Sequence, residues 1–157
     1  MPRRPGIKVQ KIDPDPIYKN RVLAKLINRA MRDGKKSVAQ KAVYKALTIV
    51  KEKTGEDPMK IFAAAMDNIR PQMEVRPRRV GGAAYQVPIS VRGPRKDSLA
   101  IRWLIAAARG RNEVHTFAER LAAEIIDASN NEGLAYKKKL DVERMAEANR
   151  AFAHFRW

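Results

Sequence analysis

The part of this sequence with the most specific chemistry is a run of arginines between residues 76 and 96. It contains five arginines, one lysine and no acidic residue. A guanidinium group forms a planar fork that binds phosphate through two hydrogen bonds and stacks on nucleic-acid bases. Solubility alone does not require arginine, so the run favours binding to folded RNA. Its basic residues are Arg76, Arg78, Arg79, Arg92, Arg95 and Lys96.

Other basic residues lie in an N-terminal segment that contains Pro and Gly, and in a turn after the first predicted helix. They are Arg3, Arg4, Lys8 and Lys11 in the segment, and Lys35 and Lys36 in the turn. Each could bind a phosphate group. For each lysine taken singly, an ordinary solvated position explains the residue equally well.

A third group of basic residues lies in and beside a nearly all-apolar stretch, LAIRWLIAAA, at residues 99–108. Such a stretch is typical of a central buried helix. At 100° per residue, Ser98, Arg102 and Arg109 fall within one narrow sector, and Arg95 extends it. We therefore expect a polar stripe that reaches the surface.

No set of residues predicts catalysis. The chain has no cysteine and two histidines, which excludes disulfides, thiolate chemistry and metal centres with Cys ligands. His115 and His154 lack a second ligand at helical or hairpin spacing, so both are interpreted as surface residues. We expect no catalytic residue, no cofactor and no metal site.

The remaining candidates have ordinary structural explanations. Gly81 and Gly82 are not followed by the Lys and Ser/Thr of a phosphate-binding loop, which favours a hairpin turn. Glu119, Glu124 and Asp127 are interpreted as exposed ion-pair partners on the outer face of a helix.

The net charge of the 157 residues is +16, with a pI near 10.5. Residues 1–53 hold 15 basic and 4 acidic side chains, a net charge of +11, and residues 72–96 contribute +5. Residues 54–71 and 97–134 are near neutral, at −1 and −2, and residues 135–157 contribute +3. Separated basic zones of this kind fit one extended polyanion bound at several places.

Apolar residues at helical spacing predict five or six helices. The first spans residues 20–32, and the second begins after Ser37 as N-cap, with Val38, Ala39, Val43 and Leu47 facing inward. Asp57 and Pro58 start a third helix, and Gly110 ends the helix that contains residues 99–108. Thr116 and Glu119 have the spacing of a capping box, and a further amphipathic segment follows Gly133.

Residues 73–91 alternate with the period of a strand, on either side of Val80-Gly81-Gly82-Ala83-Ala84. This pattern predicts a two-stranded hairpin, although it leaves the loop type open. The helices offer the hairpin no sheet to join, so we expect a protruding arm that is steadied by packing at its base or by a partner.

The predicted fold is mainly α: a single domain of about six helices with a protruding two-stranded β-hairpin arm and extended basic N-terminal and C-terminal segments. The parts are an N-terminal arm at 1–17, a helical core at 18–72 and 93–147, the hairpin arm at 73–92 and a C-terminal tail at 148–157. No run approaches the ~20 apolar residues that span a bilayer, so we expect a soluble cytoplasmic protein.

Two other functions are compatible with a small, basic, helical protein. A DNA-binding regulator of the helix-turn-helix type would also be small, helical and basic, but it uses one recognition helix, usually in a symmetric dimer. A membrane-surface protein would combine basic polar faces with large exposed apolar residues. The spread of charge over several zones disfavours the first, and the use of the apolar faces in one core disfavours the second.

Two blocks of sequence resemble one family. The segment NRVLAKLINRAMRDGKKSVAQKAVYKA and the block RPRRVGGAAYQVP at residues 76–88 are similar to those of the bacterial small-subunit ribosomal protein seven family. With RKDSLAIRWLIAAARGR, the resemblance covers essentially the whole chain.

This resemblance implies a helical domain with a β-ribbon that binds the 3′ major domain of small-subunit rRNA and nucleates assembly of the head. It implies a position at the subunit interface near the exit tRNA site and the mRNA, beside ribosomal proteins nine and eleven, with no membrane and no homo-oligomer. The rRNA-binding residues would be Arg3, Arg4, Lys8, Lys35, Lys36, Arg76, Arg78, Arg79, Arg92, Arg95, Arg102 and Arg109. The exit-site tip would be Val80, Gly81, Gly82, Ala83, Ala84 and Tyr85.

Overall fold

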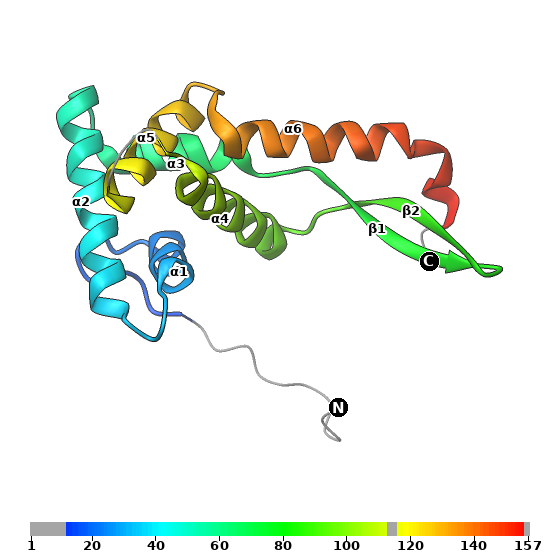
Figure 1. The fold of residues 1–157 in the computed structure, drawn as a ribbon, viewed down its shortest axis with the longest axis horizontal. Coiled ribbons are helices and arrows are strands. Elements are labelled where there is room, and N and C mark those ends of the chain that lie inside the picture. The colour runs from blue at the N-terminus through cyan, green and yellow to red at the C-terminus, as the bar shows by residue number, and fades with distance from the viewer. Residues whose placement is uncertain (1–11, 113–115, 156–157) are drawn as a thin grey trace, which may run out of the picture.

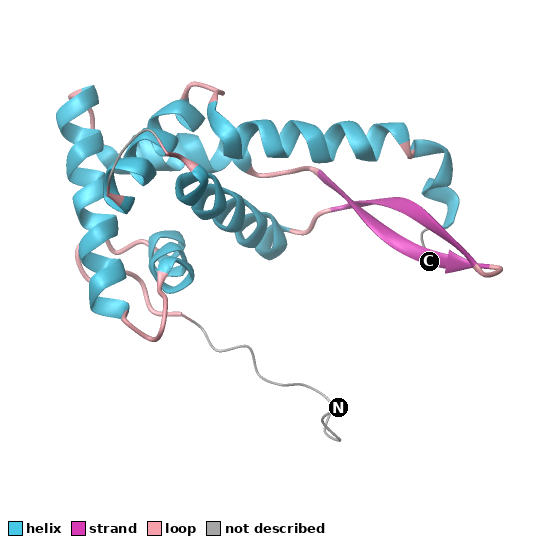
Figure 2. Cartoon of the chain, viewed as in Figure 1, coloured by secondary structure: helices cyan, strands magenta, loops and turns pink. Residues whose placement is uncertain are grey.

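A computed structural model describes residues 12–112 and 116–155 and shows a helical body with a long hairpin (Figures 1 and 2). This confirms the predicted fold class. The elements are α1 (Arg21–Ala30), α2 (Lys36–Thr54), α3 (Pro58–Ile69), β1 (Met73–Val80), β2 (Ala83–Ser90), α4 (Gly93–Gly110), α5 (Phe117–Ser129), α6 (Gly133–Ala148) and the 3₁₀-helix η1 (Arg150–Phe155).

The apolar faces of α1 to α5 close into one core. Leu26, Leu104 and Leu121 are fully buried, and Phe62 is 2% exposed. Burying a large apolar side chain contributes about 1.5–3 kcal/mol, so these contacts hold the helices in one arrangement. In Figure 1, α2 lies at one end of the molecule and the hairpin extends from the other.

The local signals at two helix starts are confirmed. At the start of α3, the Asp57 side chain accepts a hydrogen bond from the amide of Met59, and Pro58 is the first helical residue. At the start of α5, Thr116 and Glu119 form a reciprocal capping box. The start of α2 differs from the prediction, because the helix begins at Lys36 and not after Ser37. Gly34, at φ +72°, accepts a hydrogen bond from the amide of Lys36, and this tight turn starts the helix early.

One predicted core residue of α2 is not in the core. Ala39, Val43 and Leu47 are buried as expected, but Val38 is 61% exposed. It lies in the first turn of α2, directly after the loop that follows α1. The apolar face of α2 is therefore covered only from Ala39 onward.

The hairpin turn is a two-residue loop. Gly81 and Gly82 have φ values of +58° and +91°, and the register pairs Val80 with Ala83. Positive φ at both central residues is what a type I′ turn requires, and this turn matches the twist of the strands. The predicted hairpin is confirmed, and its loop type is now defined.

The C-terminal segment corrects the prediction of an extended tail. Residues 150–155 form η1, which places the rings of Phe152 and Phe155 with their centroids 5.3 and 5.1 Å from that of Tyr85. Aromatic pairs at this distance attract each other beyond the area they bury. Figure 1 shows α6 running alongside the hairpin before η1 folds onto it. The chain itself therefore steadies its hairpin arm.

The prediction that Glu124 is an exposed ion-pair partner is wrong, because this residue is fully buried. Its carboxylate accepts from the Nε of Arg111 at 2.7 Å and from the amide of Ala135 at 2.8 Å. Arg111 also pairs with Asp127. Glu124 thus joins the end of α4, the middle of α5 and the first turn of α6.

We expect Gly133→Ala to destabilise the fold by about 1–3 kcal/mol. Gly133 has φ +85°, and a Cβ there would lie 2.8 Å from Oε1 of Glu124. Urea unfolding followed by circular dichroism measures the change. Gly110→Ala is the matched control, because a Cβ there meets nothing within 4 Å and Gly110 is helical. Equal stability of the two variants would contradict the role assigned to Gly133.

Candidate nucleic-acid interface

A basic groove forms where α1 packs beside α4. A hollow of about 310 Å³ between them is lined by Arg29, Arg102 and Arg109, with no carboxylate in its wall. Arg29 and Arg102 are exposed and have no hydrogen-bond or ion-pair partner among the described residues. Three guanidinium groups gathered without an acidic partner form a surface that attracts phosphate.

The predicted stripe on α4 is present. Arg95, Ser98 and Arg102 are exposed along one side of the helix, and Arg109 is half-buried at its end. The remaining sides of α4 supply Leu99, Ala100, Ile101, Leu104, Ile105, Ala107 and Ala108 to buried positions. Between residues 97 and 109, the exposed residues of α4 are Ser98, Arg102 and Ala106, and all three lie on this side of the helix.

Arg109 is held in place by the body of the protein. Its guanidinium donates to the carbonyl of Ala30 at 2.9 Å, at the C-terminal end of α1, and lies 5.9 Å from the ring centroid of Phe117. Burial, followed by repulsion from Arg32 and Arg29, lowers the pKa of Arg109 below its usual value. Arginine stays protonated at neutral pH, so this repulsion is present in the free protein and a bound anion would relieve it.

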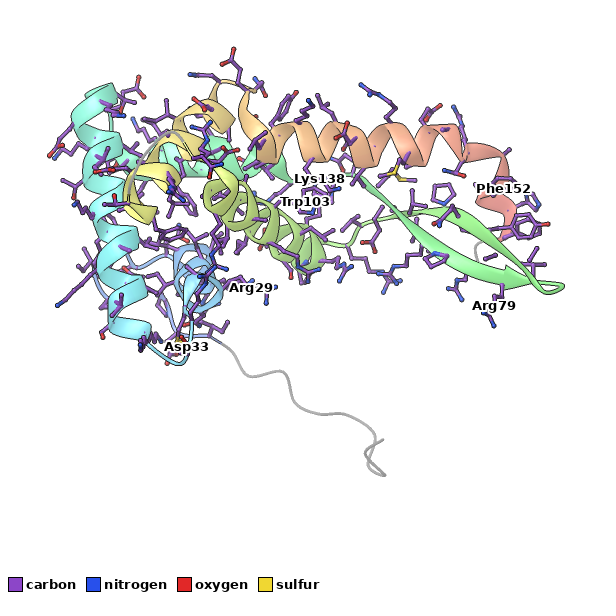
Figure 3. The ribbon with its side chains drawn as sticks, viewed as in Figure 1. Arg29, Asp33, Arg79, Trp103, Lys138 and Phe152 are labelled. Carbon is purple, nitrogen blue, oxygen red and sulfur yellow. The ribbon has the colours of Figure 1, made fainter. Side chains whose placement is uncertain are left out.

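The hairpin arginines begin beside the first turn of α4, where Arg95 lies. Glu74 on β1 is 7% exposed and accepts from the Nε of Arg76 at 2.7 Å and from Arg95 at 3.2 Å. Arg78 and Arg79 lie farther out, are exposed and have no acidic partner among the described residues. Figure 3 shows Arg29 and Arg79 along the same lower edge of the molecule.

The register spreads the arginines over both faces of the hairpin. Arg76 pairs with Val87 and Arg78 with Tyr85, so these residues share a face, whereas Arg79 pairs with Ala84 on the other. Each strand alternates as predicted, but the apolar positions of β1 and β2 fall on opposite faces. Both faces of the hairpin therefore carry positive charge.

The other predicted rRNA-binding residues are not gathered at one point. Lys35 and Lys36 are exposed at the start of α2, as its N-cap and first residue, and Arg92 is exposed at the start of α4. Arg3, Arg4 and Lys8 lie outside the described residues.

The hairpin tip is largely open to solvent. Gly81 to Ala84 are exposed, and Val80 is half-buried. Tyr85 differs from the other tip residues because its ring packs against η1. The part of the tip free to contact another molecule is therefore residues 80–84.

Sequence reasoning did not include Arg29 among the binding residues. Arg29 lies on α1, whose polar face looks like that of any amphipathic surface helix, and the exposed Arg32 lies in the loop that follows α1. The neighbouring Lys25 pairs with Asp97 of α4 at 3.6 Å. The high proportion of cations on that polar face is the sequence feature that indicates binding. Only the packing of α1 against α4 shows that Arg29 is the cation that lines the groove.

Neither a metal site nor a membrane-spanning helix is found among the described residues. In residues 12–112 and 116–155 no three His, Asp or Glu side chains are placed to hold a metal ion. Within the same residues, no helix is both long enough and apolar enough to cross a bilayer.

Comparison with known proteins gives a consistent result. The sequence profile of the family described as ribosomal protein S7p/S5e matches residues 2–150. The chain is 60% identical to small ribosomal subunit protein uS7 of Caldicellulosiruptor saccharolyticus, over 157 residues and the full length of both chains. It is 59% identical to the uS7 of Acetivibrio thermocellus and 57% to that of Shewanella amazonensis, again over both full lengths. With a basic groove, an arginine-bearing hairpin and this similarity along its length, the chain belongs to the ribosomal protein S7p/S5e family.

Proposed function

We propose that the chain is a structural protein of the small ribosomal subunit that acts by binding rRNA in the cytoplasm and catalyses no reaction. The observation that carries this proposal is the basic groove between α1 and α4 together with the arginine-bearing hairpin, which Glu74 connects to α4 through Arg76 and Arg95. Its cations have few carboxylate partners, although the chain contains 17 acidic residues. Phosphate contacts and the release of counterions would supply much of the affinity.

The finer proposal concerns where the protein binds. We propose the 3′ major domain of the rRNA, with an initiating role in assembly of the head. Several basic surfaces on one rigid body can hold separate RNA helices in a fixed relation, which favours the ordering of a junction. The proposed rRNA contacts in the described residues are Lys35, Lys36, Arg76, Arg78, Arg79, Arg92, Arg95, Arg102 and Arg109, to which we add Arg29 because it lines the groove.

The hairpin tip supports a second part of the proposal. Residues 80–84 extend beyond the contact between Tyr85 and η1, and they carry no charge. A small uncharged tip can approach a nucleic acid closely without binding it permanently. We propose that the tip lies near the exit tRNA site and the mRNA, and that ribosomal proteins nine and eleven are neighbours in the subunit.

The helix-turn-helix alternative receives no support from the structure. The basic groups lie on α1, α4 and the hairpin, whereas a DNA regulator of that type reads bases with one recognition helix. Competition between duplex DNA and a structured rRNA transcript distinguishes the two functions.

The groove yields the first binding test. The double variant Arg29→Ala, Arg102→Ala should bind a 3′ major domain transcript at least about tenfold more weakly. The slope of log K against log salt should fall by about 1 to 2, since each lost phosphate contact removes roughly 0.7–0.9 from it. Filter binding across a series of salt concentrations measures both quantities.

Lys51→Ala, Lys53→Ala is the matched control. These exposed lysines carry the same total charge but lie at the end of α2 that is away from the hairpin (Figure 1). We expect their salt slope to stay near that of the unmodified protein. An unchanged slope in the groove variant, or an equal fall in both variants, would exclude the groove as the rRNA contact.

The tip yields a separate test. Replacing residues 79–84 by Asn-Gly joins Arg78 to Tyr85, which are already paired, through a turn of the same type. Subunits should still assemble, because the groove and the Tyr85 contact remain. Deacylated tRNA should leave the exit site about tenfold faster, which corresponds to the loss of roughly 1.4 kcal/mol of contact.

The variant Arg79→Ala, with the tip intact, separates loss of charge from loss of the tip. Unaltered tRNA release from the shortened hairpin would contradict the proposed position of the tip, while leaving the rRNA proposal in place.

A further inference from the structure

A second, larger hollow lies beside the groove, where the loop after α1, the first turn of α2, the end of α4 and the start of α5 meet. Its volume is about 510 Å³. Val38, Ala42 and Phe117 supply an apolar wall, and Arg32, Lys35 and Arg109 supply positive charge. We call this hollow the Phe117 pocket. It is within the range of about 300–1,000 Å³ in which proteins bind small organic groups.

The exposure of Val38 points to an occupant. Val38 is 61% exposed, although it was expected in the core and its neighbour Ala39 is 8% exposed. Phe117 is only partly buried, and its ring lies 5.9 Å from the guanidinium of Arg109. An apolar side chain, an aromatic ring and a fixed guanidinium together form the kind of surface on which a nucleic-acid base stacks.

The charges of the pocket point to an anion. Its lining holds four cations, including Arg120, and one carboxylate, that of Asp33. Arg32 and Lys35 have no hydrogen-bonding or ionic partner for their side chains among the described residues. Arg109 is held by the carbonyl of Ala30, so it would not need to be reordered when a phosphate arrives.

From these observations we infer that the Phe117 pocket binds one unpaired nucleotide of the RNA partner. Its base would lie against Val38 and Phe117, and its phosphate would lie between Arg32, Lys35 and Arg109. This inference rests on the proposed function, because it assumes an RNA partner, and it adds to that function a contact with a base that is out of its helix. The groove and the hairpin bind the backbone, so this pocket would be a place where the protein distinguishes an unpaired nucleotide from a continuous helix.

The test compares two variants in adjacent positions. Val38→Glu places a carboxylate in the pocket wall, whereas Ser37→Glu places the same charge on the same helical turn at a residue that does not line the pocket. Both residues are exposed, so both variants should keep the melting temperature within a few degrees. The measurement is binding to the 3′ major domain transcript, in the full-length protein.

We expect Val38→Glu to weaken binding about tenfold or more and Ser37→Glu to stay within about twofold, since a stacked base contributes a factor of this size. With thiouridine in the transcript, ultraviolet light should crosslink an unpaired nucleotide to the peptide that contains Phe117. The crosslink should disappear in Val38→Glu and remain in Ser37→Glu.

Three results would overturn the inference, and they are distinguishable. In the first result, both glutamate variants bind the transcript as tightly as the unmodified protein, while Arg29→Ala, Arg102→Ala loses affinity. The pocket is then not a nucleotide site, and the proposed function stands. If all of these variants bind as the unmodified protein does, the proposed function fails as well. If Val38→Glu binds RNA normally but its subunits lack a neighbouring protein, the pocket instead binds an acidic segment of that protein.

Discussion

The carboxylate of Glu74 connects the hairpin to the helical body. The position of the hairpin arginines relative to the α1–α4 groove depends on this connection. Glu74 lies on β1 and accepts from Arg76 on the same strand and from Arg95 on α4. Leaving a nearly buried carboxylate without its cations is unfavourable, so this contact favours one relative orientation of the strand and the helix. The arginines of the hairpin therefore continue the stripe of α4, and two local patterns in the sequence become one surface.

The same use of acidic groups recurs inside the protein. Asp15 is 3% exposed and accepts from the Tyr44 hydroxyl at 2.7 Å and from two amides of its own turn. Glu124 is fully buried against Arg111 and the first turn of α6. Each of these carboxylates joins elements together instead of neutralising the exposed arginines. Among the described residues, Asp15, Glu74 and Glu124 are the buried acids, so these three carboxylates serve the fold. Burial, followed by repulsion from Arg32 and Arg29, lowers the pKa of Arg109, which shows that the arginines around it are not neutralised.

The features that could be predicted from the sequence are those that depend on a few neighbouring residues. Asp57-Pro58, the Thr116–Glu119 capping box and the Gly81-Gly82 turn each satisfy their hydrogen bonds or backbone angles within four residues. Three predictions were wrong: the exposure of Glu124, the burial of Val38 and the extended conformation of residues 150–155. In each case the environment is set by distant parts of the chain. Helical spacing places Glu124 on a polar face of α5, but only the packing of Arg111 and α6 shows that this face is buried. In the same way, the aromatic residues of η1 pack on Tyr85, which is far from them in the sequence.

The residues of the candidate site also divide into those that the sequence could reveal and those that depend on packing between helices. The stripe on α4 could be found from the sequence because the helix is apolar on its other sides, which leaves its arginines in a narrow sector. Arg29 could not be found in this way, since its importance comes from the packing of α1 against α4 and not from its own helix. The pairing of these helices requires no RNA, because Leu26 and Leu104 are buried in the core that holds them. The groove is therefore formed before binding, and a surface formed in advance loses little conformational entropy when it meets its partner. The free energy gained from phosphate contacts can then be used to order the RNA.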